Sequence, residues 1–229
     1  MAMLMRVRVS LPDRPGALGQ VARSLGTLGA DIHQVTVLER EAGRAVDDFT
    51  VSWPGTPGVD EVRDRLSAVP GVHVEGAWPT RDVPGSAPDY DLLRHVAADP
   101  GRAFATLVDA VPDLVGADWA AVVATGPQGE GAAGEAGPGD GGARTPPIVH
   151  RSWRTPPELV FAEPVPQRPQ VFGDGEARFM AVPLDGTGLC LVTGRLDGLP
   201  FHRAELAKLA RVTELVAMLA RSGAEAVPG

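Results

Sequence analysis

Hydrophobic and polar residues alternate strictly between Met5 and Leu11. A period of two predicts a strand that buries one of its faces. Residues 13–16, Asp-Arg-Pro-Gly, break this pattern, and apolar residues then recur at helical spacing from Leu18 to Leu28. The chain is therefore expected to open with a strand followed directly by an amphipathic helix.

The next segment repeats the same two kinds of pattern. Residues 32–39 and 45–53 predict two strands that form a hairpin, and apolar positions between Val59 and Val69 predict a second helix. Residues 72–78 predict a last strand. The order βαββαβ within about 75 residues predicts a ferredoxin-like α+β domain, with two helices on one face of a four-stranded antiparallel sheet.

A second folded segment is expected after a linker. Residues 80–89 are polar and rich in proline, without periodicity, and are interpreted as that linker. Beyond it, helical spacing predicts a short helix around Leu92, a longer one over residues 104–114 and a long one after Pro200. Three runs are apolar on both faces, which is typical of central strands covered above and below: residues 119–125, 178–184 and 189–194.

The stretch between these strands has a different composition. Residues 126–147 contain eight glycines and four prolines among 22 positions, and no aliphatic side chain larger than alanine. Such a segment cannot offset its ordering entropy, so it is interpreted as a flexible insertion. Residues 148–176 predict an irregular excursion that covers one sheet face, with one strand at residues 159–162.

Two short motifs in the first segment point to a known family. Residues 11–22 read Leu-Pro-Asp-Arg-Pro-Gly-Ala-Leu-Gly-Gln-Val-Ala, and residues 28–32 read Leu-Gly-Ala-Asp-Ile. Together with the strand before them, they resemble the ACT domain, a small-molecule sensing module found on many proteins of amino-acid metabolism. The resemblance covers residues 3–79. It implies that an amino acid binds where the loop after the first strand meets a neighbouring subunit.

The resemblance also implies a set of binding residues. Asp13 and Asp31 match two positions at which many ACT domains hold the amino and carboxylate groups of the ligand, frequently with asparagine. A carboxylate suits the ammonium group but repels the ligand's own carboxylate. Asp13 is alternatively a helix cap or a turn residue. The full predicted ligand-binding set is Asp13, Pro15, Gly16, Ala17, Leu18, Asp31 and Ile32.

Backbone amides supply the complementary part of this predicted site. The amides of Gly16, Ala17 and Leu18 are expected to point from a helix N-terminus, where they attract a carboxylate. Gly16, having no side chain, lets that group approach closely. If nothing binds there, the same geometry is ordinary helix capping.

The second segment resembles another sensory family. Residues 179–184, 188–194 and 199–201, followed by the final helix, are similar to the closing half of GAF domains, and residues 104–125 to the opening half. This resemblance covers residues 90–221 and implies an antiparallel sheet with flanking helices. The cyclic-nucleotide signature of some members, which begins with Asn and Lys, is missing, and no cysteine lies where a bilin would attach. Four aromatic residues are predicted as core: Trp119, Trp153, Phe161 and Phe179.

Composition narrows the function further. A net charge of -8 argues against a nucleic-acid partner. One cysteine, Cys190, allows no internal disulfide and is predicted to be a buried, inert thiol, while the five histidines show no zinc spacing. Lys208 is the single lysine and asparagine is absent, which excludes phosphate-loop and kinase motifs.

With no membrane span and no signal peptide expected at Met1–Met5, we predict a cytoplasmic protein that needs neither metal nor cofactor.

These observations predict a non-catalytic regulatory or sensor protein. It would bind an amino acid or a similar metabolite through the ACT-like domain, while the GAF-like domain relays the signal or dimerises. The alternative is an interaction subunit that uses both modules only for assembly, and an enzyme with Asp174 and Glu176 in its site is disfavoured for lack of a catalytic constellation. A homodimer is expected, because bare sheet edges attract partners and the last helix carries an apolar stripe: Leu206, Leu209, Val212, Val216 and Leu219.

Overall fold

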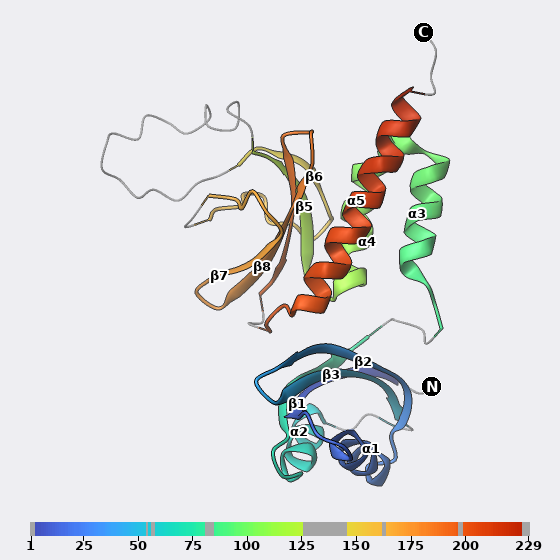
Figure 1. The fold of residues 1–229 in the computed structure, drawn as a ribbon, viewed down its shortest axis with the longest axis vertical. Helices are drawn as coiled ribbons and strands as arrows, with labels where there is room; N and C mark the ends of the chain where they lie inside the picture. The colour runs from blue at the N-terminus through green and yellow to red at the C-terminus, as the bar shows by residue number, and fades with distance from the viewer. Residues whose placement is uncertain are drawn as a thin grey trace, which may run out of the picture. The chain divides into compact units, whose positions relative to one another are not determined.

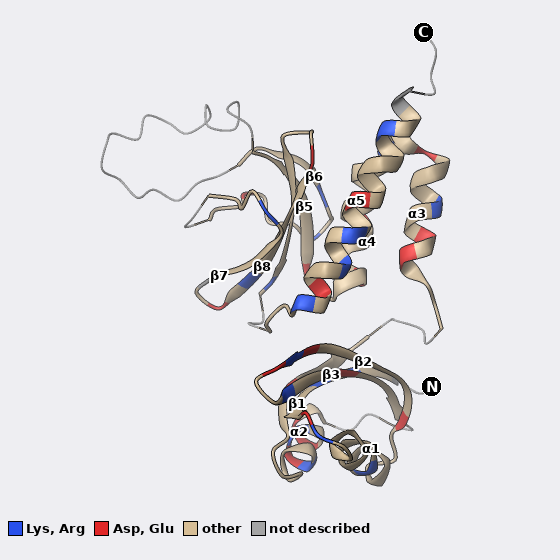
Figure 2. Cartoon of the chain, in the orientation of Figure 1, with Lys and Arg blue, Asp and Glu red and all other residues tan. Residues whose placement is uncertain are grey.

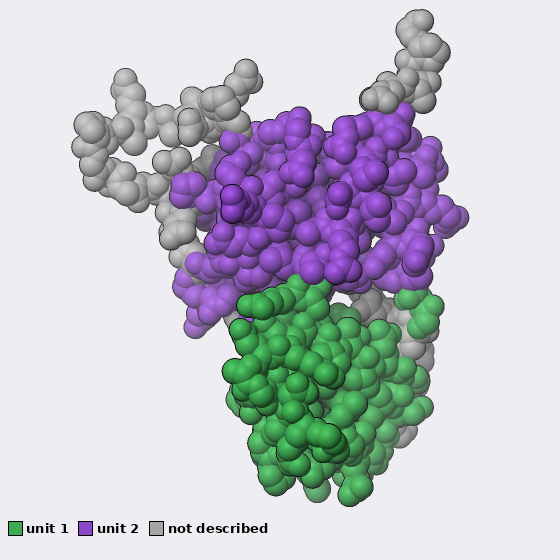
Figure 3. All heavy atoms as spheres, in the orientation of Figure 1, with its two compact units in different colours: residues 1–86, 202–204 green, residues 87–201, 205–229 purple. Residues whose placement is uncertain are grey.

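A computed structural model describes residues 3–53, 55, 58–80, 85–125, 146–161, 164–196 and 199–225. The chain divides into two compact units, coloured separately in Figure 3. Unit 1 comprises Met1–Ser86 with His202–Ala204, and unit 2 comprises Ala87–Phe201 with Glu205–Gly229. Both are mixed α+β structures built on antiparallel sheets, as the sequence predicts for the fold class.

Unit 1 has the predicted βαββαβ order. Its sheet runs β2-β3-β1-β4, with every pair of neighbours antiparallel, and both helices lie on one face of it (Figure 1). The elements are β1 (Met3–Pro12), α1 (Ala17–Thr27), β2 (Asp31–Glu41), β3 (Arg44–Trp53), α2 (Val59–Ser67) and β4 (His73–Pro79). Because β2 is an outer strand, one of its edges is unpaired within the described part of the unit.

The core of unit 1 forms as the alternation predicts. The residues of β1 at odd positions face the helices and meet the inward residues of β3, Phe49 and Val51. The helices contribute Val21, Leu25, Val62 and Leu66 to the same buried cluster. On the opposite face, Arg8 forms a two-pronged ion pair with Asp48, its partner in the strand register, at 2.7 Å and 2.9 Å.

Unit 2 contains a five-stranded antiparallel sheet in the order β6-β5-β9-β8-β7. The α-helices of this unit lie on one side of the sheet (Figure 1). Its elements are α3 (Pro88–Ala98), the short 3-10 helix η1 (Pro100–Arg102), α4 (Ala103–Val115), β5 (Trp119–Ala124), β6 (Ile148–Arg151), β7 (Gln170–Asp174), β8 (Ala177–Leu184), β9 (Leu189–Arg195) and α5 (Arg203–Glu225).

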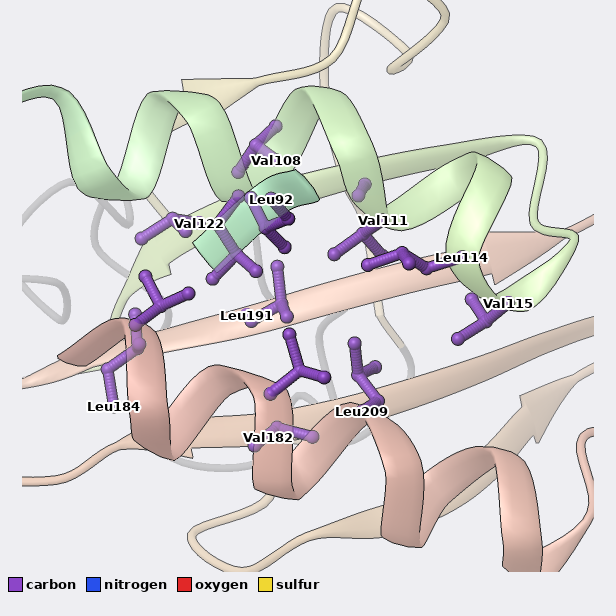
Figure 4. Packing of buried hydrophobic residues seen from close by; sticks show 14 of the residues in the cluster. Leu92, Val108, Val111, Leu114, Val115, Val122, Val182, Leu184, Leu191 and Leu209 are labelled. Carbon is purple, nitrogen blue, oxygen red and sulfur yellow. The ribbon is translucent and has the colours of Figure 1, made fainter. Parts of the chain in front are cut away.

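The helix side of this sheet carries the main core of unit 2. Side chains of α4 and α5 point toward those of the central strands, as seen for Val111, Leu209 and Leu191 in Figure 4. The predicted stripe on α5 belongs to this core: Leu209, Val212 and Val216 are buried in it, and Leu206 and Leu219 pack against it. The expectation that this stripe binds a helix of another copy was therefore wrong, because the stripe packs in the core of its own chain. The homodimer itself stays a prediction.

The other side of the sheet is covered by the segment after β6. Trp119, Phe161 and Phe179 are buried there, as predicted, with ring centroids 6.0 Å apart between Trp119 and Phe179 and 5.5 Å apart between Phe161 and Phe179. Trp153 was wrongly assigned to the core, because 85% of it is exposed. The strand expected at residues 159–162 is also wrong for its described part, where only Phe161 forms an isolated bridge. Two outer strands of the sheet, β6 and β7, were missed.

Several expectations concern segments at the margins of the described chain. Nearly all of the predicted insertion, residues 126–145, lies outside the described residues, as do residues 81–84 of the predicted linker. The end of that linker is helical, since α3 already begins at Pro88. Within the described ranges, no helix has both the length and the apolar character needed to cross a bilayer.

A buried arginine joins three parts of unit 2. The guanidinium of Arg195, at the end of β9, donates to the carbonyl oxygens of Gly116 at 2.9 Å and Pro200 at 2.7 Å, and also to that of Val115. It forms an ion pair with Glu205 of α5 at 2.6 Å. The end of α4, the end of β9 and the start of α5 are thereby held together.

Candidate functional site

The start of α1 has the backbone geometry of a binding site for an anion. Gly16 occupies the N-cap position with φ of 86°, a left-handed conformation that glycine adopts without strain. A Cβ added to Gly16 would meet no atom within 4 Å, so the space in front of this turn is open. Among the described residues, no side chain makes a capping hydrogen bond there. The alternative in which Asp13 caps the helix is therefore excluded.

Two of the three predicted amides are available to a ligand. Among the described residues, the backbone N–H groups of Gly16 and Leu18 donate to no acceptor. The amide of Ala17, which we expected to bind the ligand, instead donates to the carbonyl oxygen of Arg14 at 3.2 Å. Ala17 is buried and Pro15 lies exposed in the turn before the helix. Of the three predicted donors, Gly16 and Leu18 are thus the two without an acceptor.

The turn before these amides carries one member of an oppositely charged pair. The backbone N–H of Asp13 donates to the carbonyl oxygen of Gly43 at 2.9 Å, which ties the turn to the β2–β3 hairpin. The carboxylate of Asp13 lies 3.9 Å from Nε of Arg40, at the end of β2. That separation is too long for a hydrogen bond, so both side chains keep their hydrogen-bonding capacity for another group.

A further carboxylate, which we did not predict, completes the cluster. Asp47 pairs with Val9 in the strand register and shares the helix-facing side of β3 with Ala45 and Phe49. Only 3% of Asp47 is exposed, and its Oδ1 accepts no hydrogen bond from any described residue. Burial raises the pKa of Asp47 above its usual range; Arg40 lowers it, whereas Asp13 and Asp48 raise it further. Asp13 and Arg40 are thus among the charged groups that affect the pKa of Asp47.

The sequence contained the signal for Asp47. Strand alternation in residues 45–53 puts Ala45, Asp47, Phe49, Val51 and Trp53 on one face, and only one of these is charged. A carboxylate at an inward position of a half-buried strand is costly unless a partner compensates for it. That conflict between residue type and position marks a candidate functional residue.

Two predicted site residues lie elsewhere in the chain. Asp31 and Ile32 begin β2 and pair with Ser52 and Val51, near the end of β3, whereas the turn of Asp13 contacts the beginning of that strand. At about 3.4 Å per residue, Asp31 is roughly 27 Å away along the sheet. A single small ligand cannot touch both Asp31 and Gly16 of one chain.

The raised pKa of Asp47 has a measurable consequence for stability. Because the native state holds its proton at pH values where the unfolded chain has lost it, stability should fall as pH rises from about 4 through the native pKa. Asp47→Val removes this decline, and at pH 7 it should raise the free energy of unfolding by about 1–3 kcal/mol. Urea denaturation at pH 4 and pH 7, without added amino acids, measures both effects.

The matched control is Asp64→Asn, which removes an exposed carboxylate of α2. It should keep the pH dependence of the parent. A gain from Asp47→Val that is equal at both pH values would contradict the raised pKa of Asp47.

Unit 2 offers less for binding. An open hollow of about 600 Å³ is lined by Asp118, Trp153, Arg154 and Leu196. The guanidinium of Arg154 lies over the ring of Trp153, 4.6 Å from its centroid, and Asp118 accepts a hydrogen bond from the amide of Leu196 at 2.8 Å. Cys190 is buried as predicted, and burial raises the pKa of its thiol to about 12, so no thiolate forms near neutral pH.

Charge and metal-binding groups add no competing site. Basic and acidic residues are interleaved along the strands of unit 1 (Figure 2). Among the described residues, no group of three or more His, Cys, Asp or Glu side chains is placed to hold a metal ion.

Comparisons with other proteins identify no family for this chain. The chain matches no protein-family model and no curated protein sequence. Among solved structures, it is similar to the crystal structure of an unknown protein from Galdieria sulphuraria, at 11% sequence identity and a TM-score of 0.32. That alignment covers 95% of this chain and 93% of the other. A similarity of this size supports no conclusion about function.

Proposed function

We propose that this chain is a non-catalytic sensor or regulatory protein whose ACT-like unit 1 binds an amino acid or a similar small metabolite at the start of α1. The observation that carries the proposal is the pair of amides, from Gly16 and Leu18, which lack acceptors among the described residues and follow directly on the turn that carries Asp13 and its ion-pair partner Arg40. Amides at a helix N-terminus attract a carboxylate, and a nearby Asp attracts an ammonium group. The order of strands and helices in unit 1 agrees with the ACT resemblance.

A second copy of the chain would explain the remote predicted residues. The outer strand β2 exposes Val35 and Val37, which are 39% and 42% accessible. If two β2 strands pair antiparallel about Thr36, Asp31 of one copy lies opposite Glu41 of the other. Asp31 and Ile32 would then approach the site formed by α1 of the other copy, so the proposed site would draw residues from both copies of the predicted homodimer. The same exposed edge favours the alternative of an interaction subunit.

Gly16→Val tests the binding site. A branched side chain disfavours the left-handed backbone and fills the open space in front of the amides. In a thermal-shift screen of the common amino acids, followed by calorimetry, we expect at least one amino acid to stabilise the parent. We expect Gly16→Val to weaken its binding by at least about tenfold, the loss of one charge-assisted hydrogen bond.

Gly26→Ala, near the other end of α1, is the control and should bind normally, since a Cβ there meets no atom within 4 Å. Light scattering on the same samples tests assembly, for which we expect a mass above the 23.9 kDa of one chain. If no amino acid stabilises the parent while the protein is a stable dimer, the interaction-subunit alternative is favoured. Unchanged binding by folded Gly16→Val would place the site elsewhere.

A further inference from the structure

Among the described residues of unit 1, Asp47 carries the carboxylate oxygen that is buried without a hydrogen-bond partner. Its Oδ1 is buried and accepts no hydrogen bond from the described residues, although buried polar atoms in native proteins nearly always have partners. Arg40, the cation that acts on it, is 63% exposed in its side chain and forms no hydrogen bond with it. An unpaired buried carboxylate lowers stability, so a group that supplies hydrogen bonds and positive charge would bind there favourably.

We infer that Asp47 accepts the ammonium group of the ligand, and that the site therefore selects α-amino acids over the corresponding 2-oxo acids. This inference rests on the proposed function, since it assigns a residue to the same site. The carboxylate of such a ligand would lie at the amides of Gly16 and Leu18. Its ammonium group would lie between Asp47 and Asp13, two carboxylates that repel each other until a cation separates them.

The side of Asp47 that faces β2 provides the entry. Val37 is the register partner of Asp47 on this strand and points to the same face of the sheet, where it is 42% exposed. Arg40, further along that face, is a long exposed side chain that can move without disturbing the core. A small ligand can thus reach Asp47 by displacing the side chain of Arg40, without separating α1 from the sheet.

The chemistry of this arrangement distinguishes amino acids from their analogues. An ammonium group has three donors and a positive charge, which suit two carboxylates. A 2-oxo group at the same place has only an acceptor, so it would leave Asp47 unpaired and add repulsion. Sites built to hydrogen-bond a substrate group discriminate strongly against analogues that lack it, because the buried protein group is then left unsatisfied.

The test uses the full chain and four matched pairs of probes: L-alanine and pyruvate, L-aspartate and oxaloacetate, L-glutamate and 2-oxoglutarate, and L-phenylalanine and phenylpyruvate. Calorimetry measures the affinity of each for the parent, for Asp47→Asn and for the control Asp64→Asn. We expect the parent and the control to bind at least one amino acid at least about tenfold more tightly than its 2-oxo partner. Asp47→Asn should lose this preference.

The outcomes separate the inference from the proposed function. If the parent binds an amino acid and its 2-oxo acid equally, or if Asp47→Asn keeps the preference, the role of Asp47 is refuted while the site at α1 stands. If Gly16→Val leaves all binding intact, the site itself is refuted. Should Asp47→Asn fold poorly, Asp47→Val replaces it, because valine satisfies the apolar pattern of β3; retained preference in that variant would equally refute the role of Asp47.

Discussion

Arg195→Met is expected to lower the free energy of unfolding of unit 2 by about 3–5 kcal/mol. The side chain of Arg195 is only 3% exposed, and it donates to carbonyl oxygens at the end of α4 as well as to the carboxylate of Glu205. Its guanidinium also lies 4.0 Å from the ring centroid of Phe201. Methionine leaves the Glu205 carboxylate buried without its cation, which is the costly step.

Urea denaturation followed by circular dichroism measures this loss. The control is Arg211→Met, which removes an exposed arginine from α5, the helix that carries Glu205. It should change the free energy of unfolding by less than about 0.5 kcal/mol. The double variant Arg195→Met with Glu205→Met should recover part of the lost free energy of unfolding. Replacing both members of a buried ion pair by apolar residues leaves no buried carboxylate without its cation. A loss below about 1 kcal/mol in the single variant would show that the pair contributes little.

Gly194→Ala is expected to destabilise unit 2 by about 1–3 kcal/mol, although it adds only a methyl group. A Cβ at Gly194 would lie 2.6–2.8 Å from three atoms of the Trp119 indole ring. Trp119 is almost fully buried and packs against Phe179, so the ring cannot move away without disturbing the aromatic cluster. The glycine is required here for its lack of a side chain.

The matched control is again Gly26→Ala. Its position in α1 has free space for a Cβ, so alanine should raise stability by about 0.5–1 kcal/mol through its better helix propensity. Opposite signs for the same chemical change would confirm the steric explanation. If Gly194→Ala is as stable as the parent, the Trp119 ring can move to make room for the added methyl group, and the steric explanation is wrong.

Elements whose signal is local could be predicted from the amino-acid sequence. In unit 1, the alternation of β1 and the helical spacing of α1 predicted these elements to within two residues, because half-burial imposes a period of two on strands and 3.6 on helices. The doubly apolar runs likewise predicted the central strands β5, β8 and β9, which are covered on both faces. These patterns depend only on which side of an element meets the core.

Features that depend on partners distant in sequence could not be predicted in this way and became visible in the folded structure. The outer strands β6 and β7 lack a continuous apolar run, and they exist because their backbones pair with β5 and β8. Trp153 is aromatic yet exposed. The segment that carries it is held by two hydrogen bonds to the backbone of Ala120: Ser152 Oγ accepts from the Ala120 amide, and Thr155 Oγ1 donates to the Ala120 carbonyl oxygen.

The candidate site shows the same division. Sequence motifs located the turn at Gly16, but they could not show that Ala17 donates to Arg14 or that Asp31 lies at the far end of the sheet. Asp47 is assigned to the candidate site because strand β3 places it at the same end of the sheet as Asp13 and Arg40. A charge is compensated by whatever the fold brings near it, and that proximity is set by strand register and helix packing rather than by local sequence.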